Sequence, residues 1–186
     1  ELVFPNGDTY KTLSHFFIPA DGLEEREKRD RVPYRVWVQQ GFITATPGET
    51  IDYDVVRAHI DRAGSLYKLK ELAFDPWGAY EMAQKLDKSG VTVIPVRQNF
   101  ENMSPPTKEL AKLVLDKSVE HGNNPVLRWM ADNVVVIQDE NENVRPSKKR
   151  SKQRIDGMTA LILALGRAQR HEGGSVYDER EVRVLG

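Results

Sequence analysis

Asp75 and Asp156 are the two aspartates whose surroundings most favour metal chemistry. Asp75 directly follows the apolar run 72–74, and the Pro-Trp-Gly sequence at 76–78 then ends the strand. Asp156 stands near the start of the apolar stretch "RIDGMTALILALGRAQR" (154–170). Ionised carboxylates are costly to bury unless a basic side chain, backbone amides or a metal ion pairs with them. Hard cations such as Mg²⁺ or Mn²⁺ favour carboxylate oxygens of this kind.

The elements that carry these aspartates are predicted to bring them together. Residues 69–75 form a strand, an amphipathic helix begins at Ala79, and "VTVIPV" (91–96) forms the next strand, so the two strands should be parallel. The helix predicted over 154–170 is apolar nearly all round and should be buried. Its i+4 ridge after Asp156 carries Ala160, Ala164 and Ala168, and such small residues allow close packing against a sheet.

Structural interpretations of both aspartates remain open beside the functional one. An aspartate at a helix start often caps its own helix, and an Asp-Pro pair after a strand is often simple turn chemistry. If the two carboxylates do converge, they match a site for one or two cations. Paired cations roughly 3.5–4 Å apart stabilise both the attacking and the leaving oxygen of a phosphodiester cleavage.

A basic segment precedes the Asp156 helix. "RPSKKRSKQR" (145–154) contains six basic residues and no acid, and it follows a predicted β-hairpin at 134–146. Most charge runs are solvated loops, but this position beside a candidate metal site favours contact with a nucleic-acid backbone. The residues predicted to bind DNA are Lys148, Lys149, Arg150 and Lys152.

Composition narrows the classes of protein. The chain has 186 residues, a net charge of −1 and no cysteine. The absence of cysteine excludes disulfides and thiolate metal sites. The net charge argues against a protein that coats nucleic acid non-specifically. No apolar stretch is long enough for a membrane span. The glycines form no phosphate-binding loop, so ATP binding within this chain is not expected.

The remaining patterns predict an α/β protein with a mixed sheet. The expected elements are two strands within 1–19 around an Asn-Gly-Asp turn, a solvated charged segment at 21–32, a helix from Pro33 to Gly41, a strand at 42–48, a helix capped by Asp52 and stopped by Gly64, a helix beginning at Ser104-Pro105, and a helix from Asn124-Pro125 to Ala131.

With these residues in view, the sequence resembles the C-terminal nuclease domain of tailed-phage terminase large subunits. The segments that carry the resemblance are "DGLEEREKRDRVPYRVWVQQGFI" (21–43), "PGETIDYDVV" (47–56), "AFDPWGA" (73–79), "RQNFENMSPPTKELAKLV" (97–114), "HGNNPVLRWMADNVVV" (121–136), "RIDGMTALILALGRA" (154–168) and "SVYDERE" (175–181). No single segment is decisive, but their order and spacing make the resemblance specific.

The resemblance implies a ribonuclease H-like fold, with a mixed sheet flanked by helices and a β-hairpin near the active site. It implies a nuclease domain over 1–171 and a C-terminal tail over 172–186. Asp75 and Asp156 would be the catalytic metal ligands for one or two Mg²⁺ or Mn²⁺ ions. The family's third ligand lies on a first strand that this sequence lacks, so we expect that strand and acid upstream of residue 1. Two carboxylates supply at most half of the ligands of a two-metal site. This stretch alone should therefore bind metal weakly and cut DNA poorly.

The implied activity is metal-dependent cutting of double-stranded concatemeric DNA, by attack of a metal-activated water on the phosphodiester, when packaging starts and ends. The implied partners are the terminase small subunit, the capsid portal and an upstream ATPase domain of the same polypeptide, in the cytoplasm of an infected bacterium. Two alternatives remain: a ribonuclease H-like docking module without activity, and a phosphatase or phosphotransfer enzyme that uses the same acids.

Overall fold

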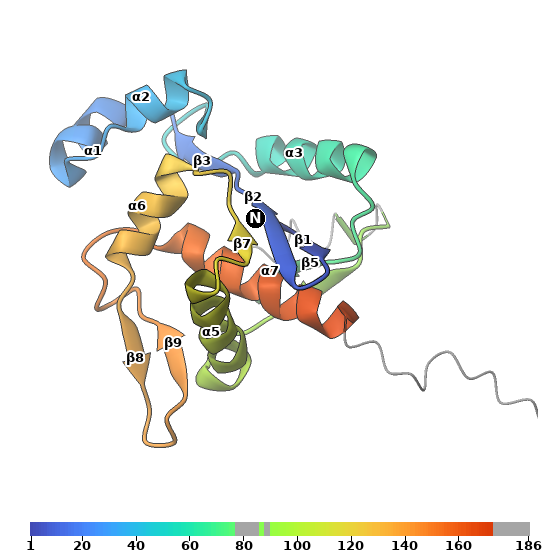
Figure 1. Ribbon diagram of the computed structural model, residues 1–186. Helices are drawn as coiled ribbons and strands as arrows, with labels where there is room; N and C mark the ends of the chain where they lie inside the picture. Colours follow the sequence, from blue (N-terminus) through green and yellow to red (C-terminus); the bar gives the residue numbers. More distant parts are fainter. Residues whose placement is uncertain (77–85, 88–89, 173–186) are drawn as a thin grey trace, which may run out of the picture.

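Helix α7 (Asp156–Glu172) lies at the centre of the packing between helices and strands. The computed structural model describes residues 1–76, 86–87 and 90–172. Helices α5 and α6 and strands β1 and β5 all contact α7, so segments far apart in sequence meet along one helix (Figure 1). The predicted burial of this helix is confirmed, because Leu161, Ile162 and Leu165 are each at most 4% exposed.

The strands form four small ladders of mixed direction. The antiparallel pair β1–β2 is extended by β7 in parallel, β3 pairs with β4 in parallel, β5 pairs with β6 in parallel, and β8 pairs with β9 as an antiparallel hairpin. Their bounds are Leu2–Asn6 (β1), Thr9–Leu13 (β2), Phe16–Pro19 (β3), Ile43–Thr46 (β4), Leu72–Phe74 (β5), Val93–Pro95 (β6), Val119–Glu120 (β7), Val136–Gln138 (β8) and Val144–Pro146 (β9). The predicted α/β class with mixed strand directions is confirmed.

Some of the helices begin at residues whose side chains cap them. Asp52 accepts hydrogen bonds from the backbone amides of residues 54 and 55 at the start of α3, and Asn124 does the same for residues 126 and 127 at the start of α6. The bounds of the helices before α7 are Leu23–Asp30 (α1), Tyr34–Gln39 (α2), Tyr53–Leu66 (α3), Phe100–Leu115 (α5) and Pro125–Asn133 (α6).

Two glycines let neighbouring elements approach α7 closely. A Cβ at Gly157 would lie 2.6 Å from a ring carbon of Phe16 and 3.0 Å from the sulfur of Met130. A Cβ at Gly166 would lie 3.1 Å from the ring of Pro106. Strand β3, helix α6 and helix α5 therefore contact α7 at positions where it has no side chain.

Several predicted boundaries were wrong. Helix α5 begins after Asn99, whose side chain accepts a hydrogen bond from the Asn102 amide, so Ser104-Pro105 lies inside the helix and does not start it. The segment 1–19 contains three strands and not two. Strand β2 ends at Leu13, and the residues from Phe16 form a separate strand, β3, which pairs with β4. Gly64 lies within α3 and does not end it.

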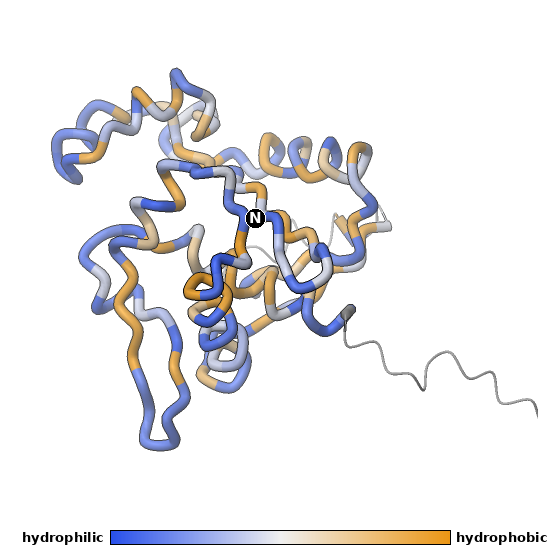
Figure 2. Tube along the Cα trace, viewed as in Figure 1, coloured by the Kyte–Doolittle hydropathy of each residue, from blue (hydrophilic) through white to orange (hydrophobic). Residues whose placement is uncertain are grey.

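The charged segment 21–32 is largely solvated, as predicted, but most of it is helical, and Val32 at its end is buried, at 5% exposed. None of the residues of α1 is buried, and Lys28 pairs with Glu24 one turn away. Figure 2 shows this helix as one of the more hydrophilic parts of the chain.

Some predictions fall outside the described residues. Residues 77–85 include Trp77 and most of the helix predicted from Ala79, and residues 173–186 include nearly all of the predicted tail. Within the described part of the chain, no helix combines the length and apolar character that crossing a membrane requires.

Candidate active site

Asp75 and Asp156, 81 positions apart in the sequence, line the same pocket. Strands β5 and β6 are parallel, as predicted, and Asp75 immediately follows the carboxyl end of β5. Asp156 is the first residue of α7. The pocket has a volume of about 210 Å³, and its walls include Ala73 of β5 with Ala160 and Ala164 of α7. Two alanines of the predicted ridge thus line the pocket, together with Thr159 and Leu163 of the same helix.

Gln98 orients the Asp75 carboxylate. Its side-chain amide Nε2 donates a hydrogen bond of 2.5 Å to Asp75 Oδ2, and Gln98 also lines the pocket. Gln98 lies just beyond the carboxyl end of β6, and parallel neighbouring strands end at the same edge of a sheet. Sequence reasoning missed this residue, although its position after the predicted strand 91–96 was the available signal.

The Asp156 carboxylate has a cationic partner. The ammonium nitrogen of Lys148 lies 2.7 Å from Asp156 Oδ1, and both side chains are about half exposed, at 57% and 53%. Lys148 was predicted to bind DNA, and its side chain also lines the pocket beside the two aspartates. The pair shows that a positive charge is accommodated at the Asp156 carboxylate.

Glu1 adds a third carboxyl group to the pocket wall. Its Oε2 accepts a hydrogen bond of 2.9 Å from the Ser14 hydroxyl, whereas its buried Oε1 has no hydrogen-bond partner among the described residues. Burial raises the pKa of the Glu1 carboxyl above its ordinary value. Sequence reasoning did not single out Glu1.

The donor chemistry of this pocket fits a hard divalent cation. Two aspartates face it, a lysine ammonium already lies against one of them, and a buried glutamate oxygen lacks a partner among the described residues. In the described ranges, however, no three histidine, aspartate or glutamate side chains gather closely enough to form a metal-binding group. The described residues therefore bring carboxylate oxygens to one pocket, and metal binding by Asp75 and Asp156 stays a prediction.

The basic segment between β9 and α7 is a structured turn with exposed charges. Lys148, Lys149, Arg150 and Lys152 are all exposed. Ser147 accepts hydrogen bonds from the backbone amides of residues 150 and 151 through its carbonyl oxygen, and the Ser151 hydroxyl accepts one from the Val135 amide. The turn is thus tied to the start of the hairpin and leads directly into the Asp156 helix.

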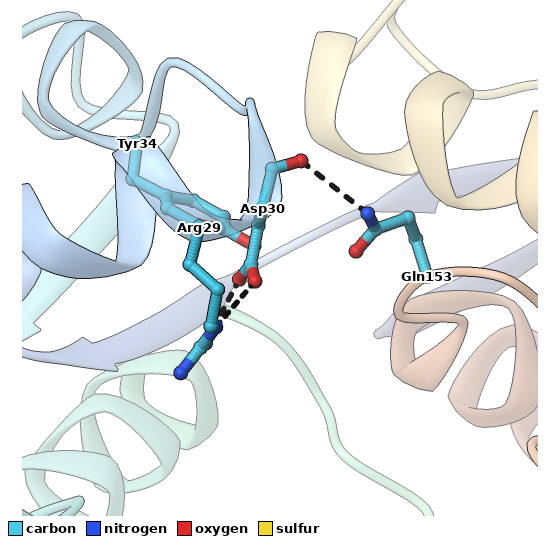
Figure 3. A network of polar contacts seen from close by, with 4 residues as sticks. All are labelled: Arg29, Asp30, Tyr34 and Gln153. Carbon is cyan, nitrogen blue, oxygen red and sulfur yellow. Dashed lines mark hydrogen bonds and ion pairs between the residues drawn. The ribbon is translucent and has the colours of Figure 1, made fainter.

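A network of polar contacts joins α1 to the end of this turn. The Gln153 side-chain amide donates a 3.3 Å hydrogen bond to the Asp30 carbonyl oxygen (Figure 3). The Asp30 carboxylate accepts from Arg29, which lowers its pKa, and from the Tyr34 hydroxyl at 3.1 Å. Burial, together with the hydrogen bond to Asp30, raises the pKa of Tyr34 to about 12. The network connects the outer helices to the segment that precedes Asp156.

The β8–β9 hairpin projects from the body of the molecule (Figure 1), and its strand β9 contacts α5. The Val144 amide donates to the Ser104 hydroxyl at 3.1 Å, and the Arg145 guanidinium lies 4.9 Å from the centre of the Phe100 ring. Arg145 is therefore engaged with α5, unlike the lysines that follow it. The turn of the hairpin is hydrophilic (Figure 2).

Comparison with known proteins identifies the family. A family model described as "Terminase large subunit, endonuclease domain" matches residues 1–172. The chain belongs to the terminase large subunit endonuclease domain family. This agrees with the resemblance noted in the sequence.

Individual terminase relatives match over most of the chain. The large terminase subunit of Enterobacteria phage HK97 is 36% identical over 174 residues, which cover 91% of this chain and 34% of that protein. Protein YmfN of Escherichia coli K12 is 31% identical, over 88% of this chain and 37% of that protein. The crystal structure of the HK97 large terminase superposes with a TM-score of 0.81 at 34% identity, covering 88% of this chain and 34% of that one. The chain thus spans about a third of the length of these relatives.

Proposed function

We propose that this terminase domain is a metal-dependent endonuclease with a ribonuclease H-like fold. It cuts double-stranded concatemeric phage DNA at the start and end of packaging, in the cytoplasm of the infected bacterium. Residues 1–171 form the nuclease domain and residues 172–186 a tail. Its partners are double-stranded DNA, the terminase small subunit, the capsid portal and an ATPase domain of the same polypeptide.

The pocket shared by Asp75 and Asp156 is the observation that carries this proposal. The two carboxylates reach one cavity from different elements, with Glu1 on the same wall. Such a set of oxygen donors suits one or two Mg²⁺ or Mn²⁺ ions. When bound, the metal lowers the pKa of a water molecule and stabilises negative charge on the departing 3′ oxygen.

The other residues around the pocket orient the Asp75 carboxylate and bind the DNA backbone. Gln98 fixes one oxygen of Asp75, so the carboxylate keeps one orientation in the pocket. Lys148, Lys149, Arg150 and Lys152 lie on the turn that leads into Asp156, so a phosphate backbone bound to the turn would pass beside the carboxylates. These contacts go to phosphates, so the preference for DNA sequence should be low.

The proposal is tested by nicking of supercoiled plasmid in the presence of Mn²⁺, with these residues as part of their full-length polypeptide, because the stretch alone is expected to cut poorly. Asp75→Asn and Asp156→Asn should each abolish nicking, because each removes a negative oxygen ligand while nearly preserving shape. Asp61→Asn is the matched control, since Asp61 is a half-exposed aspartate of α3 that pairs with Arg57. Nicking by the control should equal that of the wild type.

Three results would contradict the proposal. Equal nicking by the wild type and both aspartate variants would place the chemistry elsewhere. Binding of DNA without any nicking would indicate the non-catalytic docking role. Turnover of small phosphate esters without nicking would indicate a phosphatase.

A further inference from the structure

A second polar contact joins β5 to α7 at the opposite end of their interface from the aspartates. The Glu71 carboxylate accepts two hydrogen bonds from the Arg167 guanidinium, one from Nε to Oε1 and one of 3.0 Å from Nη2 to Oε2. His171 Nε2 lies 3.2 Å from the same Oε2. Glu71 directly precedes β5, and Arg167 lies on α7.

The Glu71–Arg167 pair is better shielded than the other ion pairs of the described residues. The two side chains are only 9% and 20% exposed. Hydrogen bonds from Arg167 lower the pKa of the Glu71 carboxyl, so the pair stays ionised at neutral pH. An arginine that binds a carboxylate through two parallel hydrogen bonds fixes direction as well as distance.

The distance from one end of the interface to the other is similar along β5 and along α7. Glu71 lies four positions before Asp75, which is ~13 Å along a strand. Arg167 lies eleven positions after Asp156, which is ~16 Å along a helix. Strand and helix therefore run in opposite directions, with the Glu71–Arg167 pair at one end and the two aspartates at the other.

The packing between these ends combines small and large apolar side chains. Ala73 of β5 and Ala160 and Ala164 of α7 line the pocket at this interface, where Phe74 and Leu163 also lie. Dispersion and hydrophobic contacts of such side chains are individually weak and have no preferred direction. The paired hydrogen bonds of Arg167 add a contact of fixed direction at one end of the interface.

We infer that Arg167 and Glu71 are positioning residues, which set the register of β5 along α7 and thereby the separation of Asp75 from Asp156. The effect on register concerns the fold alone, whereas the consequence for DNA cleavage rests on the proposed nuclease function. A displacement of about 1 Å at reacting groups can reduce a rate by about 100-fold. Loss of the pair should therefore reduce catalysis without direct contact with DNA.

The register is measured with two nitroxide labels. The chain has no cysteine, so Lys70→Cys and Lys108→Cys introduce unique attachment sites. Lys70 is exposed beside Glu71, and Lys108 is exposed on α5, which packs against α7. Pulsed electron paramagnetic resonance measures the distance between the two nitroxides. It should give one narrow distance distribution in the doubly labelled parent, and a shifted or broadened one after Arg167→Met. Arg170→Met is the matched control, since Arg170 is an exposed arginine on the same helix, and it should leave the distribution unchanged.

Cleavage kinetics give the second measurement, at a temperature where circular dichroism shows every variant folded. Arg167→Met and Glu71→Gln should lower kcat for plasmid nicking by about 10- to 100-fold and leave KM for DNA unchanged. Arg167→Lys keeps the charge but loses the paired hydrogen bonds, so it should restore only part of kcat. If Arg167→Met does not fold, the nitroxide distances and the nicking kinetics are measured in Arg167→Lys and Glu71→Gln instead.

The outcomes separate this inference from the proposed function. An unchanged distance distribution in the Arg167 and Glu71 variants would overturn the positioning role, whatever their activity. A shifted distribution in a protein whose wild type does not nick DNA would retain the register role and refute the nuclease proposal. A shifted distribution with unchanged kcat would show that the register does not control catalysis, and would also overturn the inference.

Discussion

The ammonium of Lys148 lies 2.7 Å from the carboxylate of Asp156, so a residue expected to bind DNA is the counter-ion of an expected metal ligand. A divalent cation at Asp156 has to compete with this lysine. Lys148→Met should therefore tighten Mn²⁺ binding. An exposed ion pair contributes about 0.2–1 kcal/mol, which limits the decrease in Kd to about fivefold. Titration followed by the electron resonance signal of free Mn²⁺ measures the effect.

Lys149→Met is the control for this substitution. Lys149 is an exposed neighbour on the same turn, but Lys148 is the residue paired with Asp156. Its removal should change Mn²⁺ affinity much less. Weaker Mn²⁺ binding in Lys148→Met than in wild type would show that the lysine supports the metal and does not compete with it.

Lys149, Arg150 and Lys152, which are exposed on the turn after Lys148, should contribute to DNA affinity by neutralising phosphates. In the triple variant Lys149→Gln, Arg150→Gln and Lys152→Gln, binding should weaken for all DNA sequences alike. The slope of log K against log salt should become shallower by about 0.9 for each phosphate that the variant no longer neutralises. Fluorescence anisotropy at several salt concentrations measures this slope.

A triple variant on α5 and its C-terminal turn controls for the loss of net charge. Lys108→Gln, Lys112→Gln and Lys117→Gln remove three exposed positive charges from another part of the surface. This variant should retain the wild-type slope. An equal change of slope in both triple variants would mean that DNA affinity depends only on the net charge, and that the turn is not a preferred binding site.

The ends of the elements that carry Asp75 and Asp156 were predictable because strong local patterns surround them. An apolar run interrupted by Asp-Pro marks the end of β5, and a long apolar helix marks the start of α7. Parallel pairing of β5 with β6 followed from the single crossover helix that the sequence predicts between them. The shared position of the aspartates in one pocket therefore agrees with the spatial arrangement that the sequence predicted.

Contacts between distant segments were not predictable from the same patterns. The position of Gln98 after the predicted strand 91–96 was a weak signal of its place, but no local rule pairs Gln98 or Glu1 with Asp75 or Asp156. The start of α5 was misplaced because Ser104-Pro105 is a strong helix-start pattern, whereas Asn99, five residues earlier, provides the cap that forms. The Glu71–Arg167 pair likewise depends on how β5 lies against α7, which only the fold determines.

Gly157 and Gly166 of α7 should respond differently to alanine. At Gly157 a new Cβ would lie 2.6 Å from the ring of Phe16, so this side chain or the strand that carries it would have to move. Overpacking of this kind costs about 1–3 kcal/mol, which exceeds the gain of about 1 kcal/mol in helix propensity. At Gly166 the nearest atoms lie at 3.1 Å, and the two effects should nearly cancel. Thermal unfolding followed by circular dichroism compares the two, and an equal Tm for both variants would contradict the close approach at Phe16.

His15 should make the stability of the fold sensitive to mild acid. Its ring lies 4.0 Å, centre to centre, from that of His59. Burial, with a contribution from His59, lowers the pKa of His15 from 6.5 to about 4. The folded state therefore holds His15 neutral, and the unfolded chain binds a proton more readily. The stabilisation is fully present above about pH 6.5 and is lost as the pH falls from 6.5 towards 4.

The contribution of His15 is measured by comparing wild type with His15→Gln in denaturant titrations at pH 7.5 and pH 4.5. One pKa unit corresponds to about 1.4 kcal/mol, and partial solvent screening reduces the expected effect to about 1–2 kcal/mol. The wild type should lose that much more free energy of unfolding than the variant between the two pH values, because glutamine cannot take up the proton. Equal losses would mean that His15 is charged as easily in the folded chain as in the unfolded one, which the packing against His59 does not allow.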